Sequence, residues 1–330
     1  MPYVPVLDIS RDPDLVGQEL DEICRTVGFF QIVGHGLDDG IVDRAWQTST
    51  QFFDLPLADK LSVACPAPGY PYGYIPIAGE SLSQSMVDAA PPDLKEVYNV
   101  GPVSRPTHEF TDPDEASVYS PNLWPAALPE LEVAWTDYYR TMIELTNRLM
   151  SLCARGLGLA PDFFADKIDQ APNALRAINY PERATAPLPG QLRAGAHTDY
   201  GTLTVLRQDA VGGLEVLDLT QNWVGVESVP DAFVINIGDL MARWTNDRWQ
   251  STLHRVVDPP DPAAASARRQ SMPYFQNANW SAEVSCLEPG DKPRYEPVLA
   301  GPHLMGKFRR SVTLPTVDNA GRPGDPHRDE

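Results

Sequence analysis

The chain has 330 residues, 42% of them hydrophobic, and a formal net charge of -19 at pH 7. This length and hydrophobic fraction are enough for a large core, and we expect one compact unit. The acidic residues are spread along the chain, which argues against binding to nucleic acid or to an anionic membrane. A small-molecule partner is therefore expected.

The start of the chain, MPYVPVLDISRDPD, lacks a basic region followed by an apolar core, and no apolar run approaches about 18 residues. We therefore expect neither a signal peptide nor a membrane-spanning helix, and predict a cytoplasmic protein. A monomer is the expected oligomeric state, because no spare apolar helix is evident.

Strand and helix patterns alternate over the first 60 residues. The run VPVLDIS predicts a short strand, and residues 14–27 carry apolar side chains at helical spacing. The run GFFQIVGHG is β-prone and is closed by glycines, after which residues 38–53 resume a helical pattern. These elements predict a helical layer at the N-terminus.

Residues 62–126 are rich in Pro, Gly and Tyr and predict loops with short strands. An irregular segment of this length is often functional, and this one can cover the mouth of a pocket. The candidate substrate contacts are Tyr72, Tyr74, Met86, Tyr98 and Asn99 from this segment and Phe275 from a later one. The next segment, residues 128–157, has the longest helical pattern of the chain.

After residue 174 the pattern changes to short β-type runs divided by turn residues. Seven or eight strands at this spacing suggest a jelly roll. The predicted fold class is α+β: a double-stranded β-helix core over residues 174–316, with a helical and irregular region, residues 1–173, packed on it. Residues 317–330 are polar and predict a disordered tail.

A His-x-Asp pattern stands in the run AGAHTDYGTLTVLRQD, at His197 and Asp199. With six His and 45 acidic residues in the chain, about one such match is expected by chance. His327 and Asp329 repeat the spacing in the tail, so the pattern alone does not identify a metal site. On a strand, however, residues two apart point to the same face and can reach one ion.

His254 supplies the third ligand that such a site requires. It lies on another predicted strand, 55 residues after Asp199, and a rolled sheet can return it to the first pair. Two imidazoles and one carboxylate on one face of a metal leave three adjacent positions open, which is the arrangement of non-haem Fe(II) oxygenases. We therefore expect His197, Asp199 and His254 to form a catalytic metal centre.

Arg269 and Ser271, in RRQSMPYF, are also two apart on a predicted strand and share a face. A guanidinium fork with a hydroxyl beside it is a good receptor for a carboxylate. Tyr180, in AINYP, can supply a further hydroxyl to the same anion. Arg268 is adjacent to Arg269 and is expected on the opposite face.

Several motifs, in the same order along the chain, resemble the isopenicillin N synthase-like family of Fe(II)- and 2-oxoglutarate-dependent dioxygenases. VPVLDIS, GFFQIVGHG and FFDLPLADK are similar to its N-terminal region, and AHTDYGTLTVLRQD, WVGVESVPDAFVINIGD, TNDRWQSTLHRV and RQSMPYF to its catalytic core. The resemblance implies that His197, Asp199 and His254 bind Fe(II). It also implies that Arg269 and Ser271, with Tyr180 as a further candidate, hold the far carboxylate of 2-oxoglutarate.

The chemistry implied by this resemblance is an oxidoreductase reaction in which dioxygen and 2-oxoglutarate are consumed and succinate and CO2 are released. A small-molecule metabolite is oxidised, most commonly by hydroxylation, with desaturation and cyclisation as the other outcomes. One alternative is an Fe(II) oxidase of the same family that binds the substrate's own carboxylate through Arg269 and Ser271. A second alternative is a zinc hydrolase with the same two His and one Asp.

Arg207 is unusual, because members of the family that this chain resembles usually have an apolar residue at this position of the TLTVL-x-QD run. It is interpreted either as a residue on the outer face of its strand or as the binding group for an anionic substrate. The parity of the strand after Gly201 is too uncertain in the sequence to choose between these interpretations.

Overall fold

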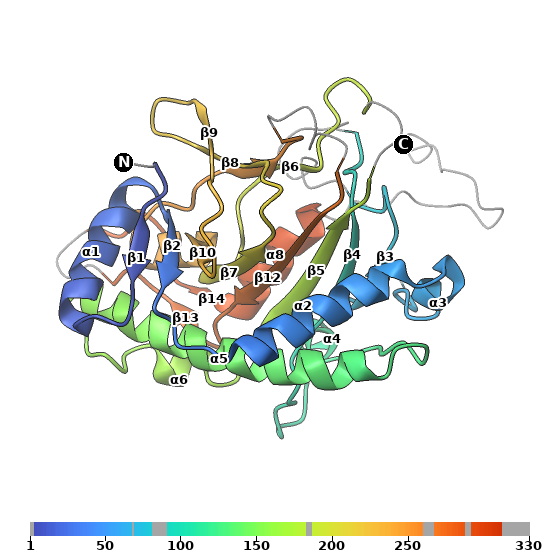
Figure 1. The fold of residues 1–330 in the computed structure, drawn as a ribbon. Helices are drawn as coiled ribbons and strands as arrows, with labels where there is room; N and C mark the ends of the chain where they lie inside the picture. Colours follow the sequence, from blue (N-terminus) through green and yellow to red (C-terminus); the bar gives the residue numbers. More distant parts are fainter. Residues whose placement is uncertain are drawn as a thin grey trace, which may run out of the picture.

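Two facing β-sheets form the centre of the structure, a computed structural model that describes residues 3–67, 69–80, 91–182, 187–259, 267–287 and 292–311 (Figure 1). The large sheet contains, from one edge to the other, β1 (Val6–Asp8), β2 (Phe29–Val33), β10 (Phe233–Ile237), β7 (Leu203–Gln208), β12 (Arg269–Gln276), β5 (Ala174–Tyr180), β4 (Glu96–Val100) and β3 (Gly73–Ile75). The small sheet contains β6 (Ala194–His197), β11 (His254–Val256), β8 (Leu214–Leu217) and β9 (Trp223–Gly225). A two-stranded sheet pairs β13 (Glu283–Val284) with β14 (Val298–Leu299).

Three helices cover the outer face of the large sheet, opposite the small sheet (Figure 1). They are α1 (Pro13–Thr26), α2 (Asp39–Asp54) and the 27-residue α5 (Glu130–Gly156). The shorter helices are α3 (Leu57–Leu61), α4 (Pro113–Val118), α6 (Ala165–Ile168), α7 (Asp239–Trp244) and α8 (Ala300–Ser311). Within the described ranges, no helix has the length and apolar character needed to cross a membrane.

The predicted fold class is confirmed: a jelly-roll core carries a helical layer on its outside. The long helix predicted over residues 128–157 is α5, and the helices predicted over residues 14–27 and 38–53 are α1 and α2. Strands β1 to β4, which come from the first 100 residues, extend the large sheet at both of its edges. The predicted disordered tail, residues 317–330, lies outside the described residues.

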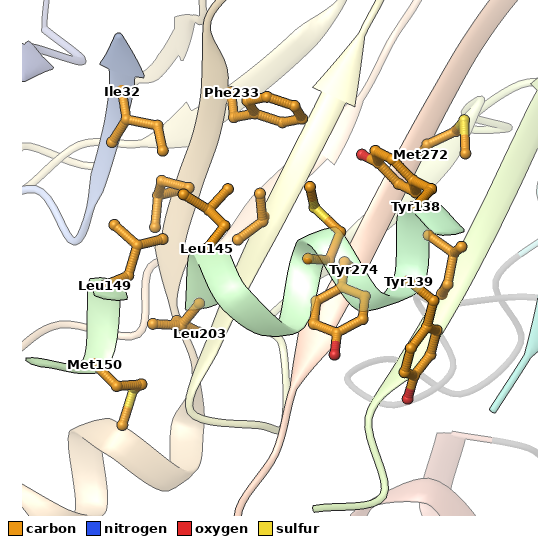
Figure 2. Close-up of a cluster of buried hydrophobic side chains, with 14 of the residues drawn as sticks. Ile32, Tyr138, Tyr139, Leu145, Leu149, Met150, Leu203, Phe233, Met272 and Tyr274 are labelled. Atoms are coloured by element: carbon orange, nitrogen blue, oxygen red, sulfur yellow. The ribbon is translucent and has the colours of Figure 1, made fainter. Parts of the chain in front are cut away.

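The most extensive hydrophobic core among the described residues lies between α5 and the large sheet. Leu145 and Leu149 of α5 lie close to Leu203 of β7 and Ile32 of β2, and Tyr138 and Tyr139 lie beside β12 (Figure 2). The apolar residues of α5 recur every three or four positions, which places them on one helical face. This packing fixes the outer face of the sheet, so the alternate side chains point to the inner face.

A smaller core lies between the two sheets. It joins Phe29 of β2 and Val234 of β10 to Leu214 and Val216 of β8 and Val256 of β11. The two sheets are therefore held together at one end by apolar contact.

The helix α8 was not anticipated by the sequence analysis. Its apolar residues are few, and the sequence predicts this segment only as part of the core over residues 174–316. Its N-terminal half carries Leu304 and Met305, which face the space between the sheets.

The contact between α1 and α5 depends on two glycines. A Cβ atom at Gly17 would lie 2.9 Å from Cβ of Arg155 and 3.0 Å from the backbone nitrogen of Gly156. A Cβ atom at Gly156 would lie 2.5 Å from the carbonyl oxygen of Gly17. The two backbones approach too closely for any side chain, so α1 lies directly on α5.

We predict that Gly17→Val lowers the free energy of unfolding by about 1–3 kcal/mol, because the helices must separate to accept the side chain. Urea denaturation followed by circular dichroism measures the change. Gly225→Val is the matched control: a Cβ there meets no atom within 4 Å, and a change of about 0.5 kcal/mol or less is expected. Equal stability of the two variants would contradict the close approach.

Candidate functional site

His197, Asp199 and His254 come together at one end of the small sheet. His197 is the last residue of β6 and pairs in register with His254, the first residue of β11. Asp199 follows β6 in the turn that leads to β7. Nε2 of each histidine lies 3.9 Å from Oδ1 of Asp199, and all three ligand atoms lie within 4.8 Å of one another. The three residues that the sequence singled out therefore form one cluster that can hold a metal ion.

Backbone carbonyls orient both imidazoles. Nδ1 of His197 lies 2.7 Å from the carbonyl oxygen of Gly195, and Nδ1 of His254 lies 3.1 Å from that of Thr252. A carbonyl oxygen can only accept a hydrogen bond, so each Nδ1 carries the proton and each Nε2 has a free lone pair. Both lone pairs point to the centre of the cluster, as metal binding requires.

Two neutral donors fix the carboxylate of Asp199. Thr204 of β7 donates to Oδ2 of Asp199 over 2.5 Å, and the side-chain amide of Asn236 on β10 donates to the same oxygen over 2.7 Å. Oδ1 is left to face the histidines. The large sheet thus supports the acidic ligand, while the small sheet supplies the two basic ones.

The electrostatics of the cluster favour the metal-binding protonation states. Burial, followed by repulsion from His254, lowers the pKa of His197 to about 3, although the charge of Asp199 acts in the opposite direction. Burial alone would raise the pKa of Asp199. The two histidines and the hydrogen bonds from Thr204 and Asn236 outweigh that effect, and the pKa of this carboxyl is lowered. A neutral imidazole and an ionised carboxylate are the forms that bind metals.

Arg269 lies on the inner face of β12 with only 1% of its surface exposed. Its guanidinium donates to the carbonyl oxygen of Gly212 over 3.0 Å, to the side-chain oxygen of Gln208 over 2.9 Å and to Oγ of Ser271 over 3.3 Å. The ring of Tyr180, the register partner of Arg269 on β5, lies under the guanidinium with its centre 4.9 Å away. Among the described residues, no carboxylate forms an ion pair with Arg269.

One cavity of about 510 Å³ joins the metal-ligand cluster to the Arg269 group. Its lining includes the three cluster residues together with Arg269, Ser271 and Tyr180. Because all six open into the same space, a molecule that contacts Arg269 can also reach the cluster.

The comparisons with known proteins agree with this geometry. Residues 4–127 match the family model described as the N-terminal region of a non-haem dioxygenase in morphine synthesis, and residues 172–278 match the model of the 2OG-Fe(II) oxygenase superfamily. A 2-oxoglutarate-Fe(II) type oxidoreductase, hxnY, from Emericella nidulans is 31% identical over 324 residues, covering 93% of this chain and 90% of the relative. This chain belongs to the 2OG-Fe(II) oxygenase superfamily.

Two further relatives extend the comparison. Validamycin A dioxygenase from Streptomyces hygroscopicus subsp. limoneus is 34% identical, covering 85% of this chain and 78% of the relative. The crystal structure of a full-length Neurospora crassa protein in complex with alpha-KG and thymine has a TM-score of 0.82 at 29% identity, covering 94% of this chain and 97% of that one. The protein is therefore a non-haem Fe(II)- and 2-oxoglutarate-dependent dioxygenase that uses dioxygen and acts on small molecules.

The residues of the oxygenase that orient Asp199 were missed in the sequence analysis. A signal for Asn236 does exist, because it is the one polar residue in the strand FVINI. Thr204 has a weaker signal, since threonine is common in strands. Gln208 and Gly212, which bind the Arg269 guanidinium, could not be found without knowing that β7 and β12 are neighbours.

Asp239, the first residue of α7, links the surroundings of both histidines of the oxygenase. Its backbone N–H donates to the carbonyl oxygen of Asp199 over 2.7 Å. Its carboxylate accepts from Ser251 over 2.7 Å, from Thr198 over 3.3 Å and from Lys307 of α8 over 2.7 Å. Asp239 is therefore not a metal ligand in this geometry but a support for the segments that carry the ligands.

The structure resolves the two interpretations of Arg207 in favour of the outer face. Arg207 forms an ion pair with Asp43 of α2 over 2.7 Å, and its guanidinium lies 5.0 Å from the ring centre of Trp46. It is absent from the cavity lining, so an anionic substrate does not meet it there. As expected, Arg268 also points outwards and pairs with Asp54 of α2 over 2.5 Å.

The candidate substrate contacts lie on two sides of the large sheet. Tyr72, Asn99 and Phe275 line the cavity. The rings of Tyr74 and Tyr98 instead pack in the core on the helical side of the sheet. Met86 lies outside the described residues.

We predict that Thr204→Val weakens the binding of a divalent metal about 10–100-fold, because Asp199 loses a donor that holds Oδ1 towards the histidines. Calorimetric titration of the metal-free protein with Co(II) under anaerobic conditions measures the affinity. Thr141→Val, which changes the same residue type on α5, is expected to leave the affinity at the wild-type value. An unchanged affinity for Thr204→Val would show that the carboxylate does not depend on this hydrogen bond.

Proposed function

We propose that this oxygenase hydroxylates a C–H bond of a small metabolite, with Fe(II) held by His197, Asp199 and His254. In the same proposal, Arg269 and Ser271 hold the far carboxylate of 2-oxoglutarate, with Tyr180 beneath the guanidinium. The observation that carries it is a buried guanidinium without a counter-ion among the described residues, opening into the cavity that contains the metal-ligand cluster. A buried unpaired charge is costly, so such a group is expected to bind an anion.

The cluster fits Fe(II) because it offers two neutral Nε2 atoms and one carboxylate oxygen, all facing one point. Such a set leaves adjacent positions for other ligands. When bound, the iron supplies the activation of dioxygen that is coupled to the decarboxylation of 2-oxoglutarate. The protein's own contribution is to hold the ligands in one geometry and to surround the cavity with side chains that limit the entry of water.

The Arg269 group fits a dicarboxylic co-substrate better than a neutral one. Gly212, Gln208 and Ser271 hold the guanidinium in place, while its position on the inner face of β12 leaves it at the cavity wall. A charged bidentate pair with the hydroxyl of Ser271 nearby would hold one carboxylate in one orientation. The rest of the co-substrate then extends into the cavity, towards the cluster.

Hydroxylation is the proposed reaction because it requires the positioning of one C–H bond of the substrate. Desaturation and cyclisation require a second reacting bond of the substrate to be positioned as well. The relatives support a small substrate: one is named for validamycin A, and the Neurospora crassa protein is seen with thymine. The zinc hydrolase is disfavoured because it leaves the Arg269 group without a role. The 2-oxoglutarate-independent oxidase is disfavoured because the matched family and relatives are defined by 2-oxoglutarate.

Arg269→Lys is predicted to raise the dissociation constant of 2-oxoglutarate about 10–100-fold. A lysine keeps the charge but loses the bidentate fork and the stacking on Tyr180. The measurement is a titration of the anaerobic Fe(II) protein, followed by the visible metal-to-ligand charge-transfer band of bound 2-oxoglutarate. Arg268→Lys is the matched control, since the neighbouring arginine points to α2, and it should leave the constant unchanged.

Succinate release in a screen of small metabolites tests the reaction as a whole. His254→Ala is expected to reduce release to background, because two ligands do not retain the metal. If no charge-transfer band formed with the wild-type protein, 2-oxoglutarate would not chelate the metal and the assignment of Arg269 would be wrong.

A further inference from the structure

The cavity has a second polar wall, formed by β4 and β5 at a distance from the Arg269 group. Asn99 of β4 and Arg176 of β5 are register partners, and both line the cavity. Tyr180, under the Arg269 guanidinium, is four residues further along β5, which corresponds to about 13 Å. This wall therefore lies beyond the residues assigned to 2-oxoglutarate, in the part of the cavity that remains for the substrate.

Asn99 is a buried amide without a hydrogen bond to any described residue. Only 4% of its surface is exposed, and neither its side-chain nitrogen nor its side-chain oxygen has a partner there. Each of the other buried asparagines in the described ranges makes at least one side-chain hydrogen bond; these are Asn173, Asn179, Asn236 and Asn277. An unpaired buried polar group destabilises a protein, so Asn99 is better explained by a ligand than by the fold.

The charges around Asn99 cancel. Arg176 forms a two-bond ion pair with Glu80, over 3.0 and 3.2 Å. Lys95 pairs with Asp93 over 2.8 Å and lies 3.7 Å from Glu80. Unlike Arg269, each cation of this wall already has an anion, so a charged substrate group would gain no free counter-ion from Arg176 or Lys95.

Apolar side chains line other parts of the cavity. Phe275 of β12 and Leu304 of α8 line the same cavity. A ligand that suits this space has one neutral polar edge and an apolar body.

We propose that Asn99 binds the substrate of this oxygenase through a two-point contact with a neutral amide, lactam or ureide group. A carboxamide presents one N–H donor and one C=O acceptor side by side, and the complementary group must present the same pair in reverse. The ion pair of Arg176 and Glu80 lies beside Asn99 and limits the space for the bound amide on that side. The inference rests on the proposed function for the identity of the substrate cavity, and it adds the chemical class of the substrate.

The test compares matched pairs of small compounds: 2-pyrrolidinone with N-methyl-2-pyrrolidinone, benzamide with N,N-dimethylbenzamide, and uracil with 1,3-dimethyluracil. Saturation-transfer NMR on the full chain measures binding, with Asn99→Leu as the variant and Asn147→Leu, on the exposed face of α5, as the control. The N–H compounds are expected to bind about ten-fold or more tightly than their N-methyl partners. Asn99→Leu should remove that difference, and Asn147→Leu should preserve it.

The thermal stability of the variant separates binding from a structural role. Asn99→Leu removes an unpaired polar group and keeps the branched shape and the number of heavy atoms of the side chain, and the cavity beside it can accept the larger methyl groups, so its melting temperature should equal or exceed that of the wild type. A clear drop would show that Asn99 has a partner in the fold, and would overturn the inference. The inference is also overturned if Asn99→Leu still binds the N–H compounds more tightly than their N-methyl partners, or if the wild type binds no N–H compound. It is overturned as well if acetate or methylammonium binds more tightly than the N–H compounds and this binding depends on Asn99.

Failure of the proposed function is recognised independently. The NMR measurement needs neither iron nor 2-oxoglutarate, whereas the charge-transfer band needs both. Absence of the band with Asn99-dependent binding of lactams would reject the proposed function and keep the amide site. A normal band without Asn99-dependent binding of lactams would keep the proposed function and reject the amide site.

Discussion

The large sheet is buried on both faces, and the alternation of side chains along its strands determines the site. On β12, Met272 and Tyr274 pack against α5, so Arg269, Ser271 and Phe275 must face the cavity. On β7, Leu203 and Val205 belong to the helical core, which leaves Thr204 to hold Asp199 and Gln208 to hold Arg269. A shift of one residue in either strand would exchange the two sets. The core beneath the sheet and the chemistry above it are thus specified by the same register.

The polar groups of the cavity are of two kinds: those whose orientation is fixed by hydrogen bonds within the protein, and those that lack a partner among the described residues. In the three residues proposed to bind the metal, each polar side-chain atom that does not face the cluster is held by a hydrogen bond: Nδ1 of each histidine and Oδ2 of Asp199. Arg269 and Asn99 have positions fixed by their strands but lack, respectively, a counter-ion and any side-chain hydrogen bond among the described residues. The first group is built to hold its geometry. The second is complete only when another molecule is present.

The fold and most of the site could be predicted because they depend on local pattern. His197 and Asp199 were separated from the identical spacing at His327 and Asp329 by the strands that follow and by the later Arg-x-Ser pair. Arg269 and Ser271 are two residues apart on one strand, so the sequence alone predicts that they share a face.

Other residues could not be placed from the sequence, because their roles depend on distant parts of the chain. The turn between Asp199 and Leu203 interrupts the alternation that starts at His197, so the side of the sheet on which Arg207 lies was open. Asn236 and Asp239 act through partners far along the chain, and only the pairing of strands and the packing of helices reveal them.

Helix α8 contacts the site in two ways, through its apolar side chains and through the ion pair between Lys307 and Asp239. Leu304 and Met305 contribute to the cavity wall, while Lys307 joins the network that steadies the turns around both histidines. A substitution at Leu304 or Met305 would therefore change the wall of the cavity without removing the contact between Lys307 and Asp239. One surface helix thus combines a part of the cavity wall with a support for the segments that carry His197 and His254.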